Sequence, residues 1–502
     1  MNIQKLNNNK IIIILKYIIG FIVLLCFWFI LISRNLGIDT DTFWHIKVGE
    51  QIVKTGQITT ANPFTWIQNS GWNQQEWLFD VILYFFVHTF DIWGFYILHA
   101  VFSIFLFFIS YKYAKPNKLL LFCVVYIVIR FIIPQYYINR PAEYSSIFFI
   151  LFLILYEKID YKKLFIYFLV GIFLSNFHCG QAFILLAFMC LQFGLDLIYL
   201  LYNKKRDILN KKYILYRIST IFVYILGLFI NPLGYIPIIS MVKAIFIDNS
   251  YIYEWLPFAS SNLITLCIIF IFFIALFFAK CDYTRKDFIN IGLLASLFIL
   301  LFKSRKAGIL FTYCYSVIGY YYIELVYNNL ITNYIKTKTL NLPKINYNKI
   351  TIIISIILAI LLCGFMFNGI ANNSFDKSVY LNVSNLSISN EILDYLKENK
   401  PDRLLHGYIT GNILLWNDIK VFQDSRQHPY IKEMGYEDTI QETFAMNKDK
   451  TGDQINKYFD KYNFDYVLIN SEFNITWYLE NRSDYIQIIN TEIDSLWKKV
   501  EN

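Results

Sequence analysis

Long uninterrupted apolar blocks constrain this chain more than any other feature of its sequence. Blocks of about 20 residues have the length that an α-helix needs to cross a lipid bilayer. Of the 502 residues, 57% are hydrophobic and only 16% are charged, a composition too apolar for an ordinary soluble enzyme. The sequence therefore predicts an α-helical polytopic membrane protein.

The apolar blocks define about eleven candidate membrane spans. They cover residues 11–33, 92–112, 119–134, 145–158, 163–177, 180–202, 214–231, 261–279, 288–302, 308–328 and 350–370. A further apolar segment, 77–90, is either another span or a helix that lies on the membrane surface. The surface interpretation places the Lys- and Arg-rich loops together on one side of the membrane. Because such loops stay in the cytoplasm, we expect a cytoplasmic N-terminus and a non-spanning segment 77–90.

This topology gathers short polar motifs on the opposite, outer face. They are DTD (39–41), NQQEW (73–77), INRPAEY (138–144), SNFHCG (175–180), NPLGY (231–235), YEWLP (253–257) and KSRKAG (303–308). A charged side chain at the bilayer centre costs about 2.5–3.5 kcal/mol, so charged groups in such chains gather at water-filled or functional places. We expect these motifs to line one cavity. The alternative is that they are ordinary loop turns, because Pro-containing dipeptides end helices in any case.

The character of the chain changes beyond residue 371. Segment 371–502 contains no run long enough to span a membrane. Short β-like runs at 404–409, 419–424 and 465–470 alternate in it with helical stretches. Strands interleaved with helices predict a small α/β domain, and an odd number of spans places it outside. The expected domains are therefore a membrane domain (1–370), with a first external loop at 35–91, and an extracytoplasmic domain (371–502).

The first external loop contains the DTD motif, followed by an amphipathic helical pattern that ends at Gly56. Asp39 and Asp41 are candidate catalytic residues. In an extended backbone, residues two apart point to the same side at about 6.6 Å, so the two carboxylates can act on one proton or hold one divalent cation. The structural alternative is that one of them caps the helix, which is worth about 0.5–2 kcal/mol.

Several motifs along the chain carry a resemblance to known proteins. In the first part of the chain they are D-x-D-T-x-W-H-x-x-x-G-E-x-I (39–52), NPFTW (62–66), W-x-x-Q-E-W-L (72–78), RP (140–141), N-x-H (176–178), NPLG (231–234) and EWLP (254–257). The C-terminal GYITGNILLW (407–416) and FQDSR (422–426) extend the likeness. Together these motifs resemble a group of bacterial integral membrane proteins of the GT-C superfamily of membrane glycosyltransferases.

The resemblance implies a GT-C-like fold and transfer of a sugar from a polyprenyl-phosphate carrier. The acceptor would be an envelope glycan, lipid or protein on the outer face of the cytoplasmic membrane, and the reaction would invert the anomeric centre. The first-loop acidic residue would act as the base or orient the acceptor, a role that falls on Asp39 or Asp41. This chain has DTD where many relatives have an Asp-Glu pair, so which carboxylate is the base stays open.

A glycosyl phosphate carries its own leaving group, so one side-chain base suffices. The leaving phosphate needs cations. Lys306 lies in KSRKAG (303–308), the basic motif that also contains the candidate residues Lys303 and Arg305. His178 can contact the phosphate or the acceptor, although a lone His near a helix end is more often structural. Glu76 and Glu254 each precede a Trp, a pairing that suits sugar hydroxyls and the apolar face of a sugar ring; the alternative for the Trp residues is an interfacial aromatic belt. The candidate substrate-binding residues are Glu76, Arg140, His178, Glu254, Lys303 and Arg305.

Two other functions fit parts of the sequence. An oligosaccharide transferase or ligase would use the same fold with a larger donor, and a metal-requiring DTD site would favour it. A non-catalytic transporter or scaffold for lipid-linked glycans commonly shows internal repeats, and none is evident here. The expected partners are a lipid-linked donor and membrane lipid, with no nucleic acid. The sugar, the acceptor, the need for a divalent cation and the oligomeric state stay open.

Overall fold

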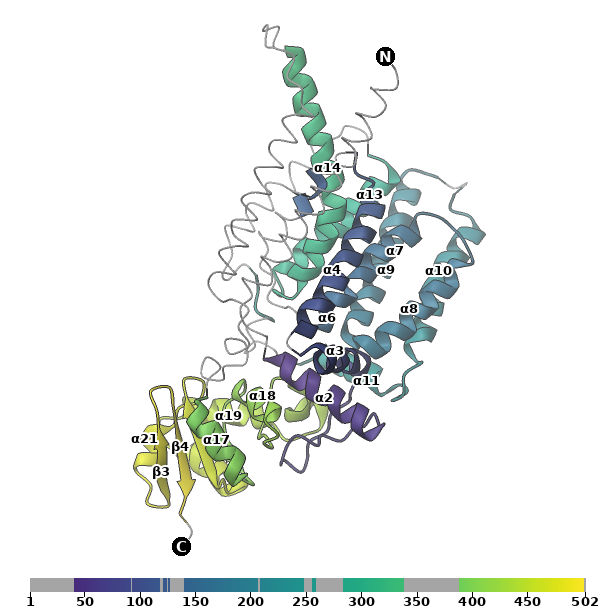
Figure 1. The fold of residues 1–502 in the computed structure, drawn as a ribbon. Coiled ribbons are helices and arrows are strands. Elements are labelled where there is room, and N and C mark those ends of the chain that lie inside the picture. The colour runs from purple at the N-terminus through teal and green to yellow at the C-terminus, as the bar shows by residue number, and fades with distance from the viewer. Residues whose placement is uncertain are drawn as a thin grey trace.

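A computed structural model of the chain describes residues 40–91, 93–117, 121–123, 125–126, 140–205, 208–247, 255–258, 283–337 and 388–500. It consists of a helical bundle with a small α/β domain at one end (Figure 1). The candidate spans 11–33, 261–279 and 350–370, and most of 119–134, lie outside the described residues. Asp39 and Glu254 also lie outside them.

The bundle is built from helices that run roughly parallel to one another (Figure 1). They are α4 (Trp93–Ala114), α6 (Pro141–Ser145), α7 (Ile147–Tyr156), α8 (Lys163–Phe177), α9 (Cys179–Tyr202), α10 (Lys211–Leu228), α13 (Arg285–Leu301) and α14 (Ala307–Thr337). Within the described ranges, three segments are long and apolar enough to cross a membrane: Trp93–Ala114, Cys179–Tyr202 and Ala307–Val326. The predicted spans that fall in these ranges coincide with helices of the bundle.

The outside of the bundle is strongly apolar. Large side chains such as Phe108, Phe165 and Leu201 are each more than 60% exposed. Apolar surface of this kind is unfavourable in water but favourable against lipid tails. The protein is therefore a membrane protein, as the sequence predicts.

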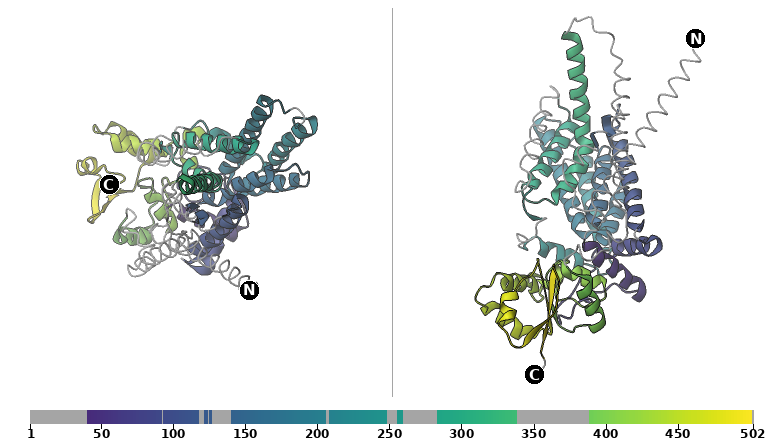
Figure 2. Two further views of the ribbon diagram at one scale, coloured as in Figure 1. Left: turned by 90° about the horizontal axis from the view of Figure 1, so that it is seen from above. Right: turned by 60° about the vertical axis from the view of Figure 1, so that its left-hand side comes forward.

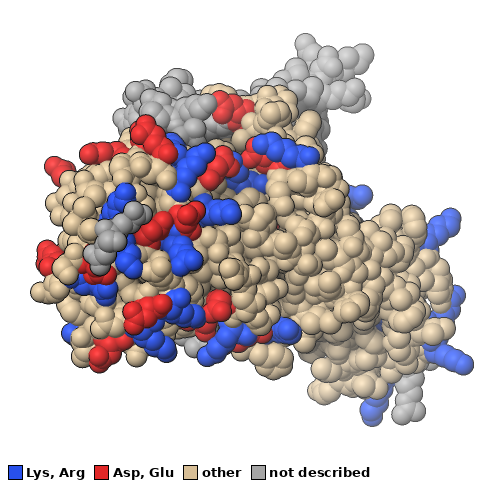
Figure 3. Space-filling model, turned by 90° about the horizontal axis from the view of Figure 1, so that it is seen from below, with Lys and Arg blue, Asp and Glu red and all other residues tan. Residues whose placement is uncertain are grey.

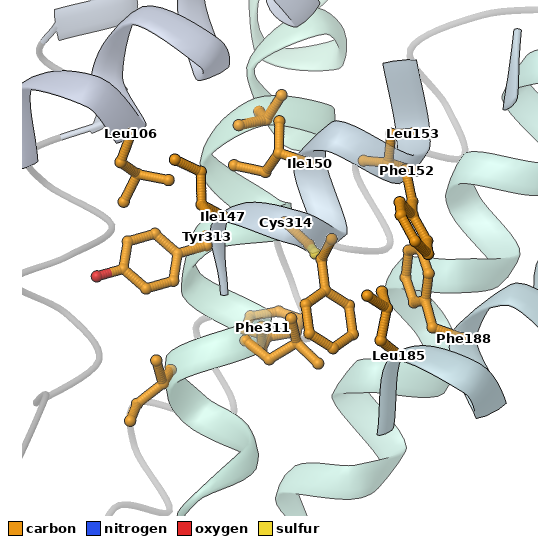
Figure 4. Packing of buried hydrophobic residues seen from close by; sticks show 14 of the residues in the cluster. Leu106, Ile147, Ile150, Phe152, Leu153, Leu185, Phe188, Phe311, Tyr313 and Cys314 are labelled. Carbon is orange, nitrogen blue, oxygen red and sulfur yellow. The ribbon is translucent and has the colours of Figure 1, made fainter. Parts of the chain in front are cut away.

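The inside of the bundle is a continuous apolar core (Figure 4). Side chains from α4, α7, α9 and α14 meet there. They include Leu106, Ile147, Ile150, Phe152, Leu153, Leu185, Phe188, Phe311, Tyr313 and Cys314. Because lipid tails are as apolar as Leu, close packing of such side chains, rather than escape from water, holds membrane helices together.

Two helices lie across the end of the bundle instead of running along it (Figures 1 and 2). Helix α2 (Asp41–Thr55) ends at Gly56, whose left-handed backbone (φ 66°) lets its N–H donate to the carbonyl oxygen of Ile52, as the amphipathic pattern predicts. Helix α3 (Trp77–Phe90) has 14 residues, a length of about 21 Å against a hydrocarbon core of about 30 Å. Its length and its orientation both fit the interpretation that 77–90 does not span. A short helix, α11 (Ile236–Ala244), lies at the same end.

The C-terminal domain contains a four-stranded sheet with strand order β1-β2-β4-β3. Strand β1 (Leu404–Leu405) is parallel to β2 (Tyr466–Asn470), whereas β3 (Tyr485–Asn490) and β4 (Asp494–Lys499) are antiparallel neighbours. Its helical elements are α17 (Asn390–Asn399), α18 (Thr410–Trp416), η3 (His428–Tyr430), η4 (Lys432–Met434), α19 (Thr439–Lys448), α20 (Asp453–Tyr462) and α21 (Thr476–Glu480). The α/β character expected for segment 371–502 is therefore present over residues 388–500. Figure 3 shows acidic and basic side chains interspersed over this domain, next to the mostly uncharged surface of the bundle, which carries basic side chains at its rim.

The first external loop and the C-terminal domain form one structural unit. Trp44 and Val48 of α2 belong to the same apolar cluster as Leu414 and Leu468 of the C-terminal domain. Residues 419–424, which read as a strand in the sequence, do not join the sheet. Instead Val421 pairs with the loop, where its N–H donates to the carbonyl oxygen of Phe64 (3.0 Å). The loop thus anchors the C-terminal domain to the end of the bundle.

Candidate active site

The sequence motifs meet where the bundle, the two crosswise helices and the C-terminal domain come together. Asp41 opens α2, Glu76 precedes α3, and Arg140 precedes α6. His178 lies at the break between α8 and α9, and the basic motif at 303–306 precedes α14. Functional side chains are therefore supplied by helix ends, where the chain leaves the bundle.

Asp41 is held between the bundle and the C-terminal domain. Arg140 Nη2 lies 2.7 Å from one carboxylate oxygen. Ser425 Oγ donates a hydrogen bond to the other. Asn412 donates through Nδ2 to Ser425 Oγ (2.8 Å) and accepts from the Ser425 N–H (3.1 Å). The position of this carboxylate is therefore set by a cation from the bundle and a hydroxyl from the C-terminal domain.

The local sequence explains how Arg140 reaches Asp41. Proline disfavours the helical conformation in the residue before it, and Arg140, just before Pro141, is extended (φ −101°, ψ 145°). Pro141 then starts α6, a position where its missing N–H costs nothing. The Arg-Pro pair thus projects the guanidinium at a helix start, where its side chain is 14% exposed.

Behind Asp41 lies a buried chain of acids and imidazoles. His45 Nδ1 is 2.5 Å from Asp80 Oδ1, and its Nε2 is 3.8 Å from Glu76 Oε2. The other oxygen of Glu76 is 3.2 Å from His178 Nε2. Gly49 permits this arrangement, because a Cβ at that position would overlap the backbone carbonyl of Asp80 where α2 crosses α3.

Burial determines the protonation states of this chain. Desolvation raises the pKa of Glu76 to about 8, although the positive charges of Lys306 and Arg140 oppose the shift. Desolvation also lowers the pKa of His178 to about 3, with Lys306 contributing, and holds the pKa of His45 well below its ordinary value. At neutral pH Glu76 is therefore largely a carboxylic acid facing a neutral imidazole.

The basic motif before α14 contributes one cation to this cluster. Lys306 is close enough to affect the pKa of Glu76, His178 and His428, and its Nζ lies 4.6 Å from the centre of the Trp255 ring. Arg305 is buried next to it, and its backbone N–H donates to the carbonyl oxygen of Leu256 (3.0 Å). Lys303 is exposed, and its backbone N–H donates back to Leu300.

Hydrogen bonds connect the remaining motifs to the same region. Trp77 Nε1 donates to Asn176 Oδ1 (2.8 Å), which joins the motifs NQQEW and SNFHCG. Asn231 Nδ2 donates to the Ser175 carbonyl (2.7 Å), which adds NPLGY. The described parts of these motifs therefore lie at the same end of the bundle. That they line one cavity stays a prediction.

Other predictions about individual site residues fall outside the described residues or were wrong. Asp39 and Glu254 lie outside the described residues. The extended backbone expected at DTD is wrong at Thr40, which is helical (φ −58°, ψ −26°). Sequence reasoning assigned no role to His45 or Ser425, although both fall inside the motifs that carry the resemblance. Asn412 likewise falls inside one of these motifs (407–416) without an assigned role. Asp80 and His428 had no sequence signal, because only folding brings them to the site.

The sequence also left open whether the DTD motif binds a divalent cation. Within the described part of the chain, no group of three or more His, Cys, Asp or Glu side chains is arranged to hold a metal ion. Of the two aspartates of the motif only Asp41 lies in the described ranges, and Arg140 Nη2 lies 2.7 Å from its carboxylate.

By sequence, no protein-family profile matches the chain and no curated protein is similar to it. By structure, its fold is similar to that of archaeal oligosaccharyltransferases of known structure. A crystal structure of an Archaeoglobus fulgidus oligosaccharyltransferase tethered to an acceptor peptide aligns with a TM-score of 0.52 at 12% identity, covering 90% of this chain and 69% of that one. The oligosaccharyltransferase AglB of the same organism, in complex with an inhibitory peptide and a dolichol-phosphate, aligns at 0.51 with 13% identity, covering 91% and 69%.

Proposed function

We propose that this protein is a membrane glycosyltransferase that transfers a sugar from a polyprenyl-phosphate carrier to an envelope acceptor on the outer face of the cytoplasmic membrane. The observation that carries the proposal is the Asp41–Arg140 pair, held at 2.7 Å where the bundle meets the C-terminal domain. It supports a base and a phosphate-binding cation at neighbouring positions in a chain with a GT-C fold. In this proposal residues 1–370 form the membrane domain and 371–502 the extracytoplasmic domain.

The reaction needs one proton acceptor and a stabilised leaving group. The acceptor hydroxyl attacks the anomeric carbon, the bond from that carbon to the phosphate oxygen breaks, and the carbon inverts. Asp41 takes the hydroxyl proton, and the phosphate leaves with both electrons of the broken bond. A guanidinium has five N–H donors, so Arg140 can contact Asp41 and the departing phosphate together, with Lys306 adding charge.

Glu76 has a different part in this scheme. As a neutral carboxyl beside His178, it adds no negative charge to a site that must hold an anionic leaving group. Its raised pKa also makes it a stronger base than an ordinary carboxylate whenever it loses its proton. Asp41 nevertheless remains the proposed base, because it is the carboxylate paired with Arg140.

A second candidate is an oligosaccharide transferase of the same fold. The similar solved structures favour it, since both are oligosaccharyltransferases. In both candidates the bond from the anomeric carbon to a phosphate oxygen breaks, and they differ in the transferred group and in the carrier that leaves. A sugar monophosphate carrier leaves as a polyprenyl phosphate, whereas a pyrophosphate-linked oligosaccharide carrier leaves as a polyprenyl pyrophosphate.

The test compares cell envelopes with and without the protein. Mass spectrometry of envelope glycans should show the loss of one sugar from a defined acceptor when the gene is deleted, and its return on complementation. Lipid extracts should accumulate the unused carrier, whose mass distinguishes a monophosphate from a pyrophosphate. Unchanged glycans and unchanged carrier lipids in the deletion strain would refute the proposal.

A further inference from the structure

One cavity lies near the candidate active site but has no role in the reaction proposed above. Its volume is about 280 Å³, near the lower limit of about 300 Å³ for small-molecule sites. Helix α11, the first external loop and the η3–η4 segment of the C-terminal domain enclose it. Its lining residues are Thr60, Gly71, Asn73, Ile236, Ile239, Ser240, Lys243, His428, Met434 and Tyr436.

The polar part of the wall suits a hydroxylated ligand. Asn73 Nδ2 donates to Ser240 Oγ across the cavity wall (2.5 Å), which fixes an amide and a hydroxyl side by side. Desolvation, with help from Lys306, lowers the pKa of His428 to about 4, so its imidazole is a neutral donor and acceptor. Tyr436 packs against Gly71, where any Cβ would collide with its ring, and offers an aromatic face of the kind that sugar rings contact.

The rim of the cavity combines one cation with an apolar surface. Lys243 is exposed on α11 and forms none of the ion pairs found among the described residues. The neighbouring Ile245 and Phe246 are 71% and 81% exposed, and Tyr235 at the start of the helix is 62% exposed. A short helix with these features lies in the membrane interface, its apolar side against lipid tails.

Short lengths of chain connect the lining residues of the cavity to residues of the candidate active site. Asn73 is three residues before Glu76, which belongs to the buried acid–imidazole chain. His428 lies within electrostatic reach of Lys306. The cavity therefore borders the segments that carry the candidate site, while Arg140 is not among its lining residues.

We propose that this cavity binds the head group of an anionic glycolipid acceptor, with sugar hydroxyls among Asn73, Ser240 and His428, a negatively charged linkage at Lys243, and apolar chains along α11. This inference rests on the proposed function, because it assigns the acceptor side of the same reaction. The donor phosphate is assigned to Arg140 and Lys306, so the donor lipid and the acceptor lipid contact different cationic side chains.

The test measures lipid binding to the purified full chain by native mass spectrometry. The probes are phosphatidylglycerol, which has a phosphate and a hydroxylated head group, and phosphatidylcholine, which has no net charge. Two further probes are glycerol 1-phosphate without acyl chains and polyprenyl phosphate. We expect a preference for phosphatidylglycerol that Lys243→Gln weakens about tenfold, the lower end of what a charge-assisted contact supplies. Lys243→Arg should preserve the preference, and Lys457→Gln, on an exposed face of α20, should leave it unchanged.

The outcomes separate this inference from the proposed function. Equal binding of both phospholipids, or no effect of Lys243→Gln, would overturn the inference. Equally tight binding of glycerol 1-phosphate would make the acceptor a soluble molecule and also overturn it. Polyprenyl phosphate should bind normally to Lys243→Gln but poorly to Arg140→Gln. The reverse pattern would show that the cavity binds the donor, which would overturn the inference but not the proposed function. Failure of polyprenyl phosphate to bind the wild-type protein counts against the proposed function alone.

Discussion

Replacing Glu76 by Gln tests the protonation state of the buried acid–imidazole chain. Glutamine keeps the size of the side chain, and its amide can donate to His178 Nε2 as the protonated carboxyl does. It cannot ionise. The variant should therefore fold normally and lose the pH dependence that Glu76 gives to the wild-type protein.

The magnitude follows from the pKa of Glu76, which burial raises from 4.5 to about 8. Because the folded state binds this proton more tightly than the unfolded state, the stabilisation is complete below pH 4.5 and is lost as the pH rises through 8. At about 1.4 kcal/mol per pKa unit, the whole loss is about 5 kcal/mol. His178, with a pKa lowered from 6.5 to about 3, changes the stability in the opposite direction below pH 6.5. From pH 6.5 to 8 the loss from Glu76 alone is about 2 kcal/mol.

The assay is thermal unfolding of the full chain in detergent or nanodiscs, followed by tryptophan fluorescence from pH 6.5 to 9. The Tm of the wild-type protein should fall across this range more steeply than that of Glu76→Gln. Infrared difference spectra should show a protonated carboxyl band that disappears near pH 8 in the wild-type protein only.

Parallel pH slopes for the two proteins would show that Glu76 is already ionised at neutral pH. The same conclusion would follow if the protonated carboxyl band were missing from the wild-type protein at pH 6.5. Either result would refute the argument that burial outweighs the nearby cations.

Three further predictions concern the site and its anchoring. Asp41→Asn should lower the rate of sugar transfer about 10²–10⁴-fold while the protein inserts normally. Asp418 is an exposed carboxylate, so Asp418→Asn should transfer sugar at the wild-type rate. Equal rates for the two variants would show that Asp41 is not the base. Arg140→Lys should reduce transfer and polyprenyl-phosphate binding because the planar fork is lost, while Lys303→Gln should change little; the opposite ranking in a transfer assay would move the phosphate to the exposed lysine. Arg426→Ala removes the guanidinium that lies 2.5 Å from the buried carboxylate of Asp424. The variant should be less stable by about 3–5 kcal/mol, and its first external loop should become accessible to proteases. An unchanged Tm and digestion pattern would contradict this.

The sequence by itself determined the features that arise from local patterns. Within the described ranges, the apolar blocks predicted as spans are helices of the bundle, because a backbone in lipid must satisfy its own hydrogen bonds. The pattern that ends at Gly56 became α2, and residues 465–470 became β2 apart from one terminal residue. The extended backbone of Arg140 also follows from a local rule, because proline restricts the residue before it.

The tertiary structure decided which of several similar groups meet. Lys303 and Lys306 look alike in the sequence, but only Lys306 affects the pKa of the buried acid and imidazole. The strand expected at 419–424 pairs with the external loop instead of the sheet, because pairing partners are chosen by packing between distant segments and not by local propensity. Strands β3 and β4, at the end of the chain, went unrecognised for the same reason.

One contact of the candidate site, between Ser425 and Asp41, has no local signal in the sequence. Ser425 and Asp41 are separated by 384 positions, and no spacing rule connects residues so far apart. They meet because α2 and the C-terminal domain share one apolar core, and burying that surface orders both segments at the end of the bundle. Local pattern therefore supplied the parts of the site, whereas long-range packing decided that a serine from the C-terminal domain contacts the carboxylate of the first loop.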